Sequence, residues 1–510
     1  MNNLLPLPVL LPLLASGLAL ALGRKPNAQR LISTTSLLIV LIIEGYLIYL
    51  TDQSGPIALS LGAWPSPLGV SVVVDRLSAL MLFVSTLVSL TVLVFSIGSE
   101  LEERRRQTPV SIYHPTFLLL TAGVSAAFIA GDLFNMFVGF EVLLFASYVL
   151  LTLGGTAERV RAGITYVIVN LLSSILFLVT IAVIYAATGT VNMAELSVRL
   201  AELPPELQLA LQLMLLTVFS IKAAVFPLSA WLPDSYPTAP APVTAVFAGL
   251  LTKVGVYAII RTQTLLFPDS PLEDLLLWAA LLTMVIGILG AVAQSDIKRL
   301  LSFTLISHIG YMIMGIALAT EAGLAGAIFY TAHHITIQTT LFLVTGLIEV
   351  RGGSTSLNKL GGLAALSPML GVLFFIPAMN LAGIPPFSGF IGKIGLLSAG
   401  VESGHPLSYP LVISAVLTSL LTLYAVAKVW NRAFWREIPD EVRSDGTSLM
   451  VQRRWVRLPQ GMVVTAGVLV LIGMGITVIA GPLYGYTDRA AIDILAVEPY
   501  LRAVLPAEYR

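Results

Sequence analysis

The chain of 510 residues contains no cysteine, few charged residues and only five histidines. Without cysteine it forms no disulfide, no thiolate metal site and no cysteine-ligated iron–sulfur cluster. Charged residues make up 11% of the sequence and sum to zero, so charge gives no basis for nucleic-acid binding. We find no glycine-rich nucleotide loop and no His/carboxylate cluster with metal-ligand spacing. The sequence therefore predicts no cofactor and no bound metal, and any work must draw on ion gradients or a partner.

Long hydrophobic runs are abundant. Hydrophobic residues make up 57% of the chain and the mean hydropathy is +0.91, which is typical of a polytopic membrane protein. We predict an all-α fold of about fourteen transmembrane helices, because apolar runs of about twenty residues recur along the whole length. They lie at 3–23, 31–50, 76–98, 113–131, 133–153, 162–187, 208–236, 240–264, 273–293, 299–318, 322–348, 366–400, 407–430 and 459–482.

Basic residues alternate between successive loops. The base-rich loops contain Arg24, Lys25 and Arg30; Arg104, Arg105 and Arg106; Arg159 and Arg161; Lys298 and Arg299; Arg351 and Lys359; and the arginines of the polar segment 431–458. The loops 51–75 and 265–272 contain none. By the positive-inside rule the base-rich loops are cytoplasmic, so we expect both termini on the outer face of the cell membrane.

Three further segments complete this topology. The first apolar run lacks a basic segment before it, so we interpret it as a retained helix and not as a signal peptide. The segment 188–207 is predicted to form a short external surface helix. The tail 483–510 is predicted to form a short amphipathic helix outside the membrane.

The stretch Leu216–Arg261 organises the chain. Two apolar runs flank a proline-rich break that begins at Pro227, and each run contains one lysine, Lys222 or Lys253. A lysine at membrane depth costs about 2.5–3.5 kcal/mol on insertion scales and usually has a function. A broken helix leaves backbone groups that lipid cannot satisfy, so it must face protein or a wet cavity. We therefore predict a polar path here; the alternative is a plain kink with lysines that snorkel to the membrane surface.

Lysine and arginine are distributed differently. Lys222, Lys253, Lys393 and Lys428 fall within or at the end of predicted helices, whereas arginine is nearly confined to loops. Arginine keeps its proton in proteins but a buried lysine can release it, so a row of lysines suits a proton relay. Lys428 lies beside Trp430 at a helix end, and we interpret it as a membrane-interface anchor.

Glu141 is the only carboxylate within the predicted helix 133–153. An unpaired carboxylate in lipid stays neutral, whereas a lysine partner lets it ionise, and we expect Lys222 to be that partner. Asp132 stands at the start of the same helix, where a carboxylate caps free N–H groups. We interpret Asp132 as a cap, with proton transfer as the alternative.

Three of the five histidines, His308, His333 and His334, fall within predicted helices. Histidine titrates near neutral pH and suits proton transfer between lysines. The alternative for each is a hydrogen-bonded structural histidine. Gln338 shares a helical face with His334, because the two residues are four positions apart.

The lysines and helix breaks recur in the second half of the chain. Lys222 accompanies the break at Pro227, and Lys393 accompanies a later break at Pro385 and Pro386. Paired interrupted helices in corresponding positions are typical of duplicated halves that meet at a transport site. The two broken helices run in opposite directions in the predicted topology, so we expect the repeats to be inverted.

Four segments carry a family resemblance. They read DLFNMFVGFEVLLFASYVLL, IKAAVFPLSAWLPDSYPTAPAPVTAVFAGLLTKVGVYAIIR, SDIKRLLSFTLISHIGYMIMG and LAGIPPFSGFIGKIGLL. From about residue 70 to 435 the chain resembles the antiporter-like subunits of complex I and of Mrp-type cation/proton antiporters. The PDSYPTAPAPVTA segment and the ending EPYLRAVLP are similar to those of the D-type member of the multisubunit Na⁺/H⁺ antiporter.

The resemblance implies a fold and a set of functional residues. It implies fourteen helices with two inverted five-helix repeats, in which helices 7 and 12 are discontinuous, and assembly with several small membrane subunits. The residues it implies are the helix 5 glutamate at Glu141, the lysines at Lys222, Lys253 and Lys393, and relay histidines at His308 and His333. Many members have a lysine where this chain has Gln338, which can hold water as part of a polar relay but cannot titrate. His334, one turn earlier, is a substitute candidate.

We divide the chain accordingly into residues 1–112 (helices 1–3), 113–264 (first repeat), 265–435 (second repeat) and 436–510 (cytoplasmic loop, helix 14 and tail).

The predicted function is proton translocation, in a row from Glu141 through the lysines and histidines to Lys393, within an antiporter complex that exchanges Na⁺ for protons. Such a subunit is a transporter and not an enzyme. Two alternatives are a proton-pumping subunit of a redox-driven complex I-like or hydrogenase complex, and an inert scaffold. Hard cations need several oxygen ligands and no acidic cluster lies in the predicted helices, so another subunit is a candidate to hold the Na⁺ site.

Overall fold

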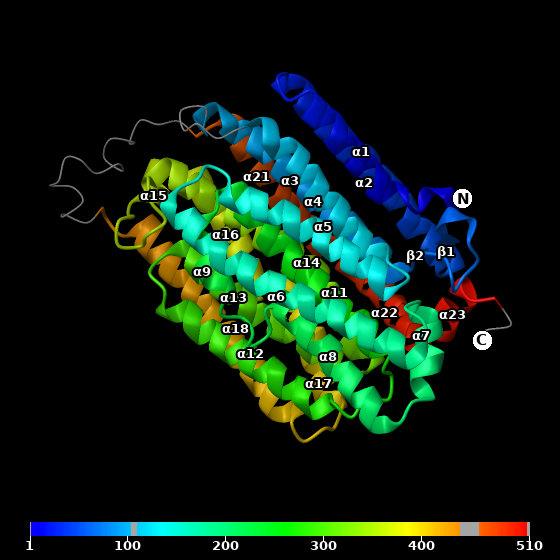
Figure 1. Ribbon diagram of the computed structural model, residues 1–510. Helices are drawn as coiled ribbons and strands as arrows, with labels where there is room; N and C mark the ends of the chain where they lie inside the picture. The colour runs from blue at the N-terminus through cyan, green and yellow to red at the C-terminus, as the bar shows by residue number, and fades with distance from the viewer. Residues whose placement is uncertain (1, 104–109, 439–457, 507–510) are drawn as a thin grey trace.

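A computed structural model describes residues 2–103, 110–438 and 458–506 and shows a bundle of long, roughly aligned helices (Figure 1). The predicted basic residues at 104–106 and most of the predicted polar loop 431–458 lie outside the described residues. Away from their ends and breaks, long helices satisfy their backbone hydrogen bonds internally, which is the condition for crossing a bilayer.

The N-terminal part is helical except for one hairpin. It comprises α1 (Leu7–Ala21), α2 (Pro26–Ser54), β1 (Ile57–Ser60), β2 (Ser71–Val74), α3 (Arg76–Glu103) and α4 (Val110–Ile129). The strands are antiparallel, with Ile57 opposite Val74 and Ser60 opposite Ser71. The purely helical prediction is wrong here, because β2 is rich in β-branched valine and is fully buried, which favours a strand.

The first break follows the next group of helices. These are α5 (Leu133–Thr152), α6 (Ala157–Thr188), α7 (Met193–Ala201) and α8 (Pro205–Ala223). α7 confirms the short helix predicted within 188–207, and the Asn192 side chain caps it by accepting from the N–H groups of Ala194 and Glu195. The helix predicted at 208–236 ends earlier, at Ala223, because Pro227 displaces the preceding residue from helical geometry and offers no N–H. Ala224 takes the left-handed conformation that closes the helix, with φ 58°.

Beyond the break the chain becomes helical again in short pieces. They are α9 (Leu232–Ser235), the 3₁₀ turn η3 (Tyr236–Thr238), α10 (Ala241–Val246), the π-helical turn η4 (Phe247–Leu251) and α11 (Thr252–Leu265). Together α10, η4 and α11 form an almost continuous, wholly buried rod, close to the helix predicted at 240–264.

The second break lies in the C-terminal half. The elements are α12 (Glu273–Ala293), α13 (Ile297–Ala317), α14 (Glu321–Gly352), α15 (Leu363–Leu366), α16 (Pro368–Ala382), α17 (Ser388–Glu402), α18 (Ser408–Val429) and the π-helical turn η5 (Trp430–Trp435). The break predicted at Pro385 and Pro386 is confirmed: α16 ends at Ala382, and Gly383 turns the chain with φ 81°.

The C-terminal part adds α21 (Gln460–Val478), α22 (Ala480–Ala496) and α23 (Glu498–Val504). The predicted tail helix is therefore longer than expected and continues α21 almost without interruption. α22 packs against α14 and α3, and α23 packs against β1 and α7. Both chain ends consequently lie at the same end of the bundle (Figure 1).

Eleven of the described helices are long and apolar enough to cross a membrane, and α1 and α16 are shorter apolar helices. α14 is not among them, although it is 32 residues long and its side chains are almost all buried. Its threonines, histidines and Gln338 lower its hydropathy, and the surrounding helices shield it at the centre of the bundle (Figure 1).

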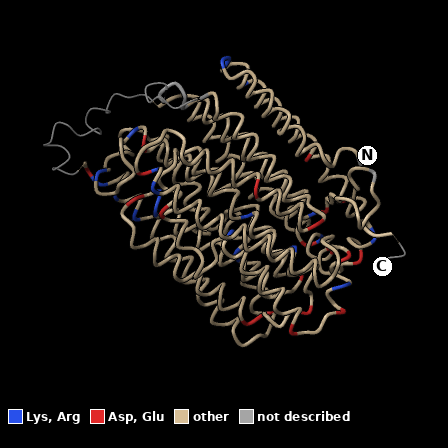
Figure 2. The backbone as a smooth tube through the Cα atoms, in the orientation of Figure 1, with Lys and Arg blue, Asp and Glu red and all other residues tan. Residues whose placement is uncertain are grey.

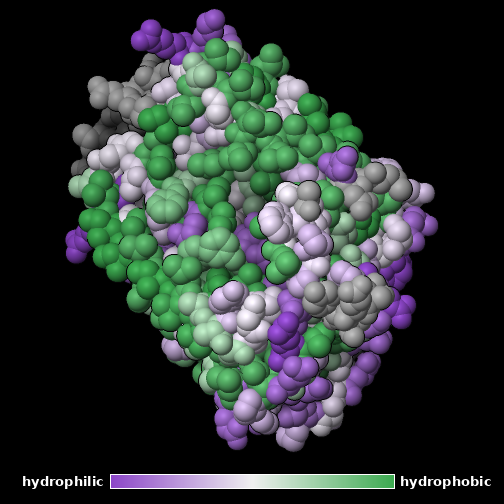
Figure 3. Space-filling model, turned by 45° about the vertical axis from the view of Figure 1, so that its right-hand side comes forward, coloured by the Kyte–Doolittle hydropathy of each residue, from purple (hydrophilic) through white to green (hydrophobic). Residues whose placement is uncertain are grey.

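Charge and hydropathy are segregated on the molecule. Lys, Arg, Asp and Glu gather at the two ends of the bundle, and few lie in between (Figure 2). A broad hydrophobic area covers the middle of the visible face, and hydrophilic residues gather toward its ends (Figure 3). On α6, for example, Ile164, Ile168 and Ile175 are more than half exposed. This surface matches the hydrocarbon layer of a bilayer.

Candidate functional site: a buried row of titratable groups

The first helix break places Lys222 inside the bundle. Lys222 lies in the last turn of α8 and is 4% exposed. Its Nζ is 3.3 Å from the Ser174 hydroxyl on α6 and 4.9 Å from the centroid of the Phe140 ring on α5. A lysine here adds positive charge where the helix dipole is negative. The end of α8 at the break therefore stabilises the buried Lys222 amine, although no described carboxylate contacts it.

Glu141 and Lys222 are neighbours but not a contact pair. Glu141 is the carboxylate that acts electrostatically on Lys222 and on Tyr148. Among the described residues no ion pair within 4.0 Å joins Glu141 to any base, and its Oε1 is buried without a hydrogen-bond partner. The direct Glu141–Lys222 pair stays a prediction, since in this conformation Lys222 bonds to Ser174 instead.

Lys253 is the most enclosed of the lysines. It lies at the start of α11, has no exposed surface, and donates a 2.6 Å hydrogen bond to the carbonyl of Ala248. Ala248 belongs to the π-helical turn η4, and π turns interrupt the regular α-helical hydrogen-bond pattern, frequently at functional sites. α11 also lies directly against α8, because a Cβ on Gly255 would be 2.6 Å from the backbone N of Ala223.

The three histidines lie close together, His308 on α13 and His333 and His334 on α14. His308 Nδ1 is 2.7 Å from the Tyr330 hydroxyl and its Nε2 is 3.4 Å from Thr422 Oγ1. The His334 ring centroid is 5.1 Å from that of His308, and both His334 nitrogens are buried without a partner. His333 Nδ1 is 3.0 Å from the Ser388 hydroxyl at the start of α17. All three side chains are fully buried.

The second helix break positions Lys393. Its Nζ donates to the carbonyls of Leu381 and Ala382, at 3.2 and 3.0 Å, which are exposed for bonding because α16 ends there. The same Nζ lies 5.0 Å from the centroid of the Tyr311 ring. Glycine is favoured at position 383 because its φ of 81° is strained for other residues, and an added Cβ would also be 2.8 Å from Lys393 Cδ.

These groups lie within electrostatic range of one another. Lys253 acts on His334, His334 neighbours His308, and Lys393 acts on His333. The structure thus brings five of the predicted residues into one buried cluster: Lys253, His334, His308, His333 and Lys393. Glu141 and Lys222 lie near each other without contact, and Lys222 is in the last turn of α8, the helix that packs against α11.

Gln338 joins two helices. Its Nε2 donates to the carbonyl of Leu301 on α13 at 2.7 Å, and its Oε1 is buried without a partner. This bond links α14 to α13. The Oε1 atom remains available to accept a hydrogen bond in a polar relay.

Two residues with structural interpretations have clear contacts. Asp132 caps α5 by accepting from the N–H of Asn135 at 2.6 Å, which confirms the cap, and burial raises the pKa of Asp132 to about 6. Lys428 has a structural contact: its Nζ donates to the carbonyls of Val292 and Gln294, at 2.9 and 2.7 Å, and so closes the end of α12. Its role as an interface anchor stays a prediction.

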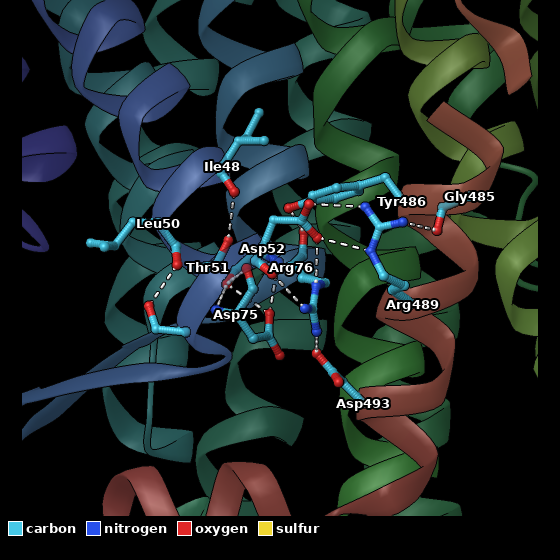
Figure 4. Close-up of polar contacts among 12 residues, drawn as sticks. Ile48, Leu50, Thr51, Asp52, Asp75, Arg76, Gly485, Tyr486, Arg489 and Asp493 are labelled. Atoms are coloured by element: carbon cyan, nitrogen blue, oxygen red, sulfur yellow. Dashed lines mark hydrogen bonds and ion pairs between the residues drawn. The ribbon is translucent and has the colours of Figure 1, made fainter. Parts of the chain in front are cut away.

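The charged residues that sequence reasoning missed include a lone glutamate and a group that joins distant segments. Glu44 stands alone in the apolar run SLLIVLIIEGYLIYL of α2, a signal that was present in the sequence. The group joins distant segments at the end of the bundle where the termini lie. Asp52 accepts hydrogen bonds from Arg76 and Arg489, and Arg76 also pairs with Asp493 (Figure 4). This group fastens α22 to the ends of α2 and α3, and its partners are too far apart in sequence to be inferred.

Comparisons with known proteins show matches over most of the chain. Residues 130–422 match the family model described as NADH:quinone oxidoreductase/Mrp antiporter, transmembrane. A relative from Alkalihalophilus pseudofirmus, named as the D subunit of a Na⁺/H⁺ antiporter, is 39% identical over 99% of this chain and 100% of its own length. The protein of the same name from Bacillus subtilis is 37% identical with the same coverage.

Solved structures extend the comparison. A chain of the Mrp complex from a Dietzia species has a TM-score of 0.89 and 32% identity, and the match covers 99% of this chain and 100% of that one. A chain of the membrane-bound sulfane sulfur reductase, an archaeal respiratory membrane complex, has a TM-score of 0.85 and 26% identity over 98% and 99%. The chain therefore belongs to the NADH:quinone oxidoreductase/Mrp antiporter family of membrane subunits, and its relatives within that family include the D subunits of Na⁺/H⁺ antiporters.

Proposed function

We propose that this membrane antiporter subunit translocates protons along its buried row of titratable groups, as part of a multisubunit Na⁺/H⁺ antiporter. One observation carries the proposal: Lys253, three histidines and Lys393 lie in one fully buried cluster next to a helix break. Buried lysines without a contacting acid are costly, and such residues within membrane segments mark ion pathways.

In the proposed mechanism a proton moves between neighbouring bases as the charge of each changes. Lys222 exchanges a proton with the Glu141 side, and its bond to Ser174 holds the amine when Glu141 is neutral. A proton on Lys253 disfavours a second positive charge on His334, so the two bases hold one proton between them, and His334 gains it as Lys253 releases it. His308 then passes the proton toward His333 and Lys393.

Hydrogen bonds orient two of the three histidines, His308 and His333, for this transfer. Tyr330 and Thr422 hold both nitrogens of His308, whereas Ser388 holds only one nitrogen of His333. The free nitrogens of His333 and His334 are the positions at which a proton can be taken up or released without breaking a protein hydrogen bond.

We also propose the finer architecture. α14 crosses the membrane within the bundle, and α16 and α17 form a single broken crossing, which together with α1 and the eleven long helices makes fourteen. Helices 7 and 12 of this count are the broken α8 and α16–α17, and residues 113–264 and 265–435 form inverted repeats. Residues 1–112 and 436–510 flank them.

The relatives and the distribution of basic residues in the loops support a proposed environment. We propose that the chain lies in the cell membrane with both termini on the outer face and that it works with other membrane subunits to exchange Na⁺ for protons. In this proposal it is a transporter subunit and not an enzyme. The similar chain in the Dietzia structure is part of an Mrp complex, which supports a hetero-oligomer.

A second candidate is a proton-pumping subunit of a redox-driven complex. The likeness to a chain of an archaeal respiratory membrane complex favours it specifically. The same buried row would serve either source of energy. Co-purification of iron–sulfur subunits with this chain would favour the redox-driven complex, and co-purification of small membrane subunits alone would favour the antiporter.

The test uses inverted membrane vesicles that contain the complete complex. Na⁺ is added to vesicles with an imposed proton gradient, and collapse of the gradient is followed by a pH-sensitive dye, for wild type and Lys222→Ala. Equal assembly is established by purification of the complex. Loss of Na⁺-triggered collapse in the assembled variant supports a proton path through this subunit, and full activity would show that the path lies elsewhere and that this chain is a scaffold.

A further inference from the structure

Glu44 is a buried carboxyl group that the proposed row does not use. It lies within α2 and has no exposed surface. Its Oε1 accepts a 3.0 Å hydrogen bond from the Thr86 hydroxyl on α3, and its Oε2 is buried without a partner. α2 stands at the edge of the bundle, away from α13 and α17, which carry part of the row (Figure 1).

The packing of α2 directs Glu44 inward. The opposite face of the helix is apolar and exposed, with Ile42 66% and Tyr49 63% exposed. Glu44 is ten residues from the end of α2 at Ser54, which corresponds to about 15 Å along the helix axis. A glutamate side chain cannot extend that far, so its carboxyl group remains in the apolar region.

No basic group faces Glu44 from the helices that pack on α2, within the parts of the chain that the structure describes. α1 has no titratable residue. On α3 the described base is Arg76, at the far end, where it pairs with Asp52 and Asp493.

On α4, Tyr113 and His114 lie near the opposite end, and His114 bonds to Ser33. On α2 itself Arg30, Tyr46, Tyr49 and Asp52 are the other titratable groups, and Asp52 is about 12 Å further along the axis.

A buried carboxylate elsewhere in the chain shows what ionisation requires. Asp75 lies 2.7 Å from Arg261 and also accepts from the N–H and hydroxyl of Ser78. Glu44 has one hydroxyl donor and no base. Burying an unpaired ionised carboxylate is far more costly than burying the neutral acid, whose O–H can also donate.

We infer that Glu44 is a proton-binding site separate from the row, and that in this conformation it holds its proton as a neutral carboxylic acid. Oε2 carries the proton, and Oε1 accepts from Thr86, which is therefore a positioning residue. Ser85 and Ser89, within one turn of Thr86 on α3, also have buried hydroxyls without a partner. Unsatisfied polar groups in one region are the type that bound water bridges in buried sites. This inference does not rest on the proposed transport function.

The test has a chemical and a spectroscopic arm, both on the assembled complex. A hydrophobic carbodiimide reacts with a protonated carboxyl group: the O–H adds across a C=N bond, and the adduct rearranges to a stable N-acylurea without loss of atoms. Peptide mass measurement locates the adduct. Infrared spectroscopy detects the carbonyl stretch of a protonated carboxyl group, which an ionised carboxylate lacks.

The expected result is a carbodiimide adduct at Glu44 near neutral pH, and a protonated-carboxyl band that Glu44→Gln removes and Glu44→Asp retains. Thr86→Val, which matches threonine in shape, should move that band to higher frequency because the carbonyl loses its hydrogen bond. The inference is overturned if Glu44 stays unmodified while Glu44→Gln leaves the protonated-carboxyl region unchanged, since the group would then be ionised. A band unaffected by Thr86→Val would overturn the positioning role.

Discussion

Arg261 and Asp75 form a buried ion pair in which Nη2 and Oδ2 are 2.7 Å apart and each side chain is 4% exposed. Arg261 lies two turns beyond Lys253 on α11, and Asp75 immediately precedes α3. The Arg261 guanidinium also lies over the rings of Tyr257 and Tyr500, so the pair joins α11, α3 and the C-terminal α23.

Breaking this pair should destabilise the protein strongly. Asp75→Asn leaves the Arg261 charge buried without compensation, which costs about 3–5 kcal/mol. Although burial alone raises the pKa of Asp75, the charge of Arg261 lowers it below 3.8 overall, so the stabilisation is present above pH 3.8 and is lost as the pH falls below that value. Thermal unfolding of the detergent-solubilised complex measures both effects. A variant as stable as wild type would show that the pair contributes nothing.

Asp132 should give the opposite pH dependence. Burial raises its pKa from 3.8 to about 6, so the folded state binds a proton that the unfolded state has released, and stability falls as the pH rises from about 4 to about 6. Asp132→Asn keeps a cap on α5 and should remove this decline, which is at most about 3 kcal/mol. Unfolding temperatures of both proteins across that pH range provide the measurement, and parallel curves would contradict the assignment.

Lys393→Arg should abolish transport while assembly is retained. Arginine can still donate to the carbonyls of Leu381 and Ala382, but it does not release its proton. The matched control is Lys428→Arg, in which the amine has an equivalent carbonyl-binding role outside the row. We expect the control to collapse the proton gradient like wild type. Equal activity of both variants would exclude proton release by Lys393.

His334 and His308 should respond differently to substitution. His334→Gln breaks no protein hydrogen bond, so transport should fall while the unfolding temperature is nearly unchanged. His308→Gln loses the Tyr330 and Thr422 contacts and should lower both. Transport assays and thermal unfolding on the same preparations separate the two cases. An active His334→Gln complex would remove His334 from the path.

Gly383→Ala tests the second helix break. The left-handed φ of 81° costs an alanine about 1–2 kcal/mol, and its Cβ would also displace Lys393, which lies 2.8 Å away at Cδ. Gly404→Ala is the control, because φ is 67° there but nothing lies within 4 Å of the added Cβ. We expect similar losses of stability and a transport defect only in Gly383→Ala; equal transport in both would show that the break does not position Lys393.

The sequence alone predicted those features that depend on residues close together in the chain. Apolar runs predicted most of the helices, because hydrophobic length decides what a bilayer accepts. Proline predicted both breaks, because the lost N–H and the ring act on adjacent residues. Lys222, Lys253 and Lys393 were identified because a lysine in an apolar run is costly wherever its partners lie.

Tertiary structure decided which of these residues meet. His308 lies beside His334, Lys222 bonds to Ser174, and Lys428 closes α12, and none of these contacts follows from spacing along a helix. The β1–β2 hairpin, the Asp75–Arg261 pair and the burial of the polar helix α14 likewise depend on segments far apart in sequence. The physical reason is that hydropathy and turn chemistry act locally, whereas the partner of a buried polar group is set by how the helices pack around it.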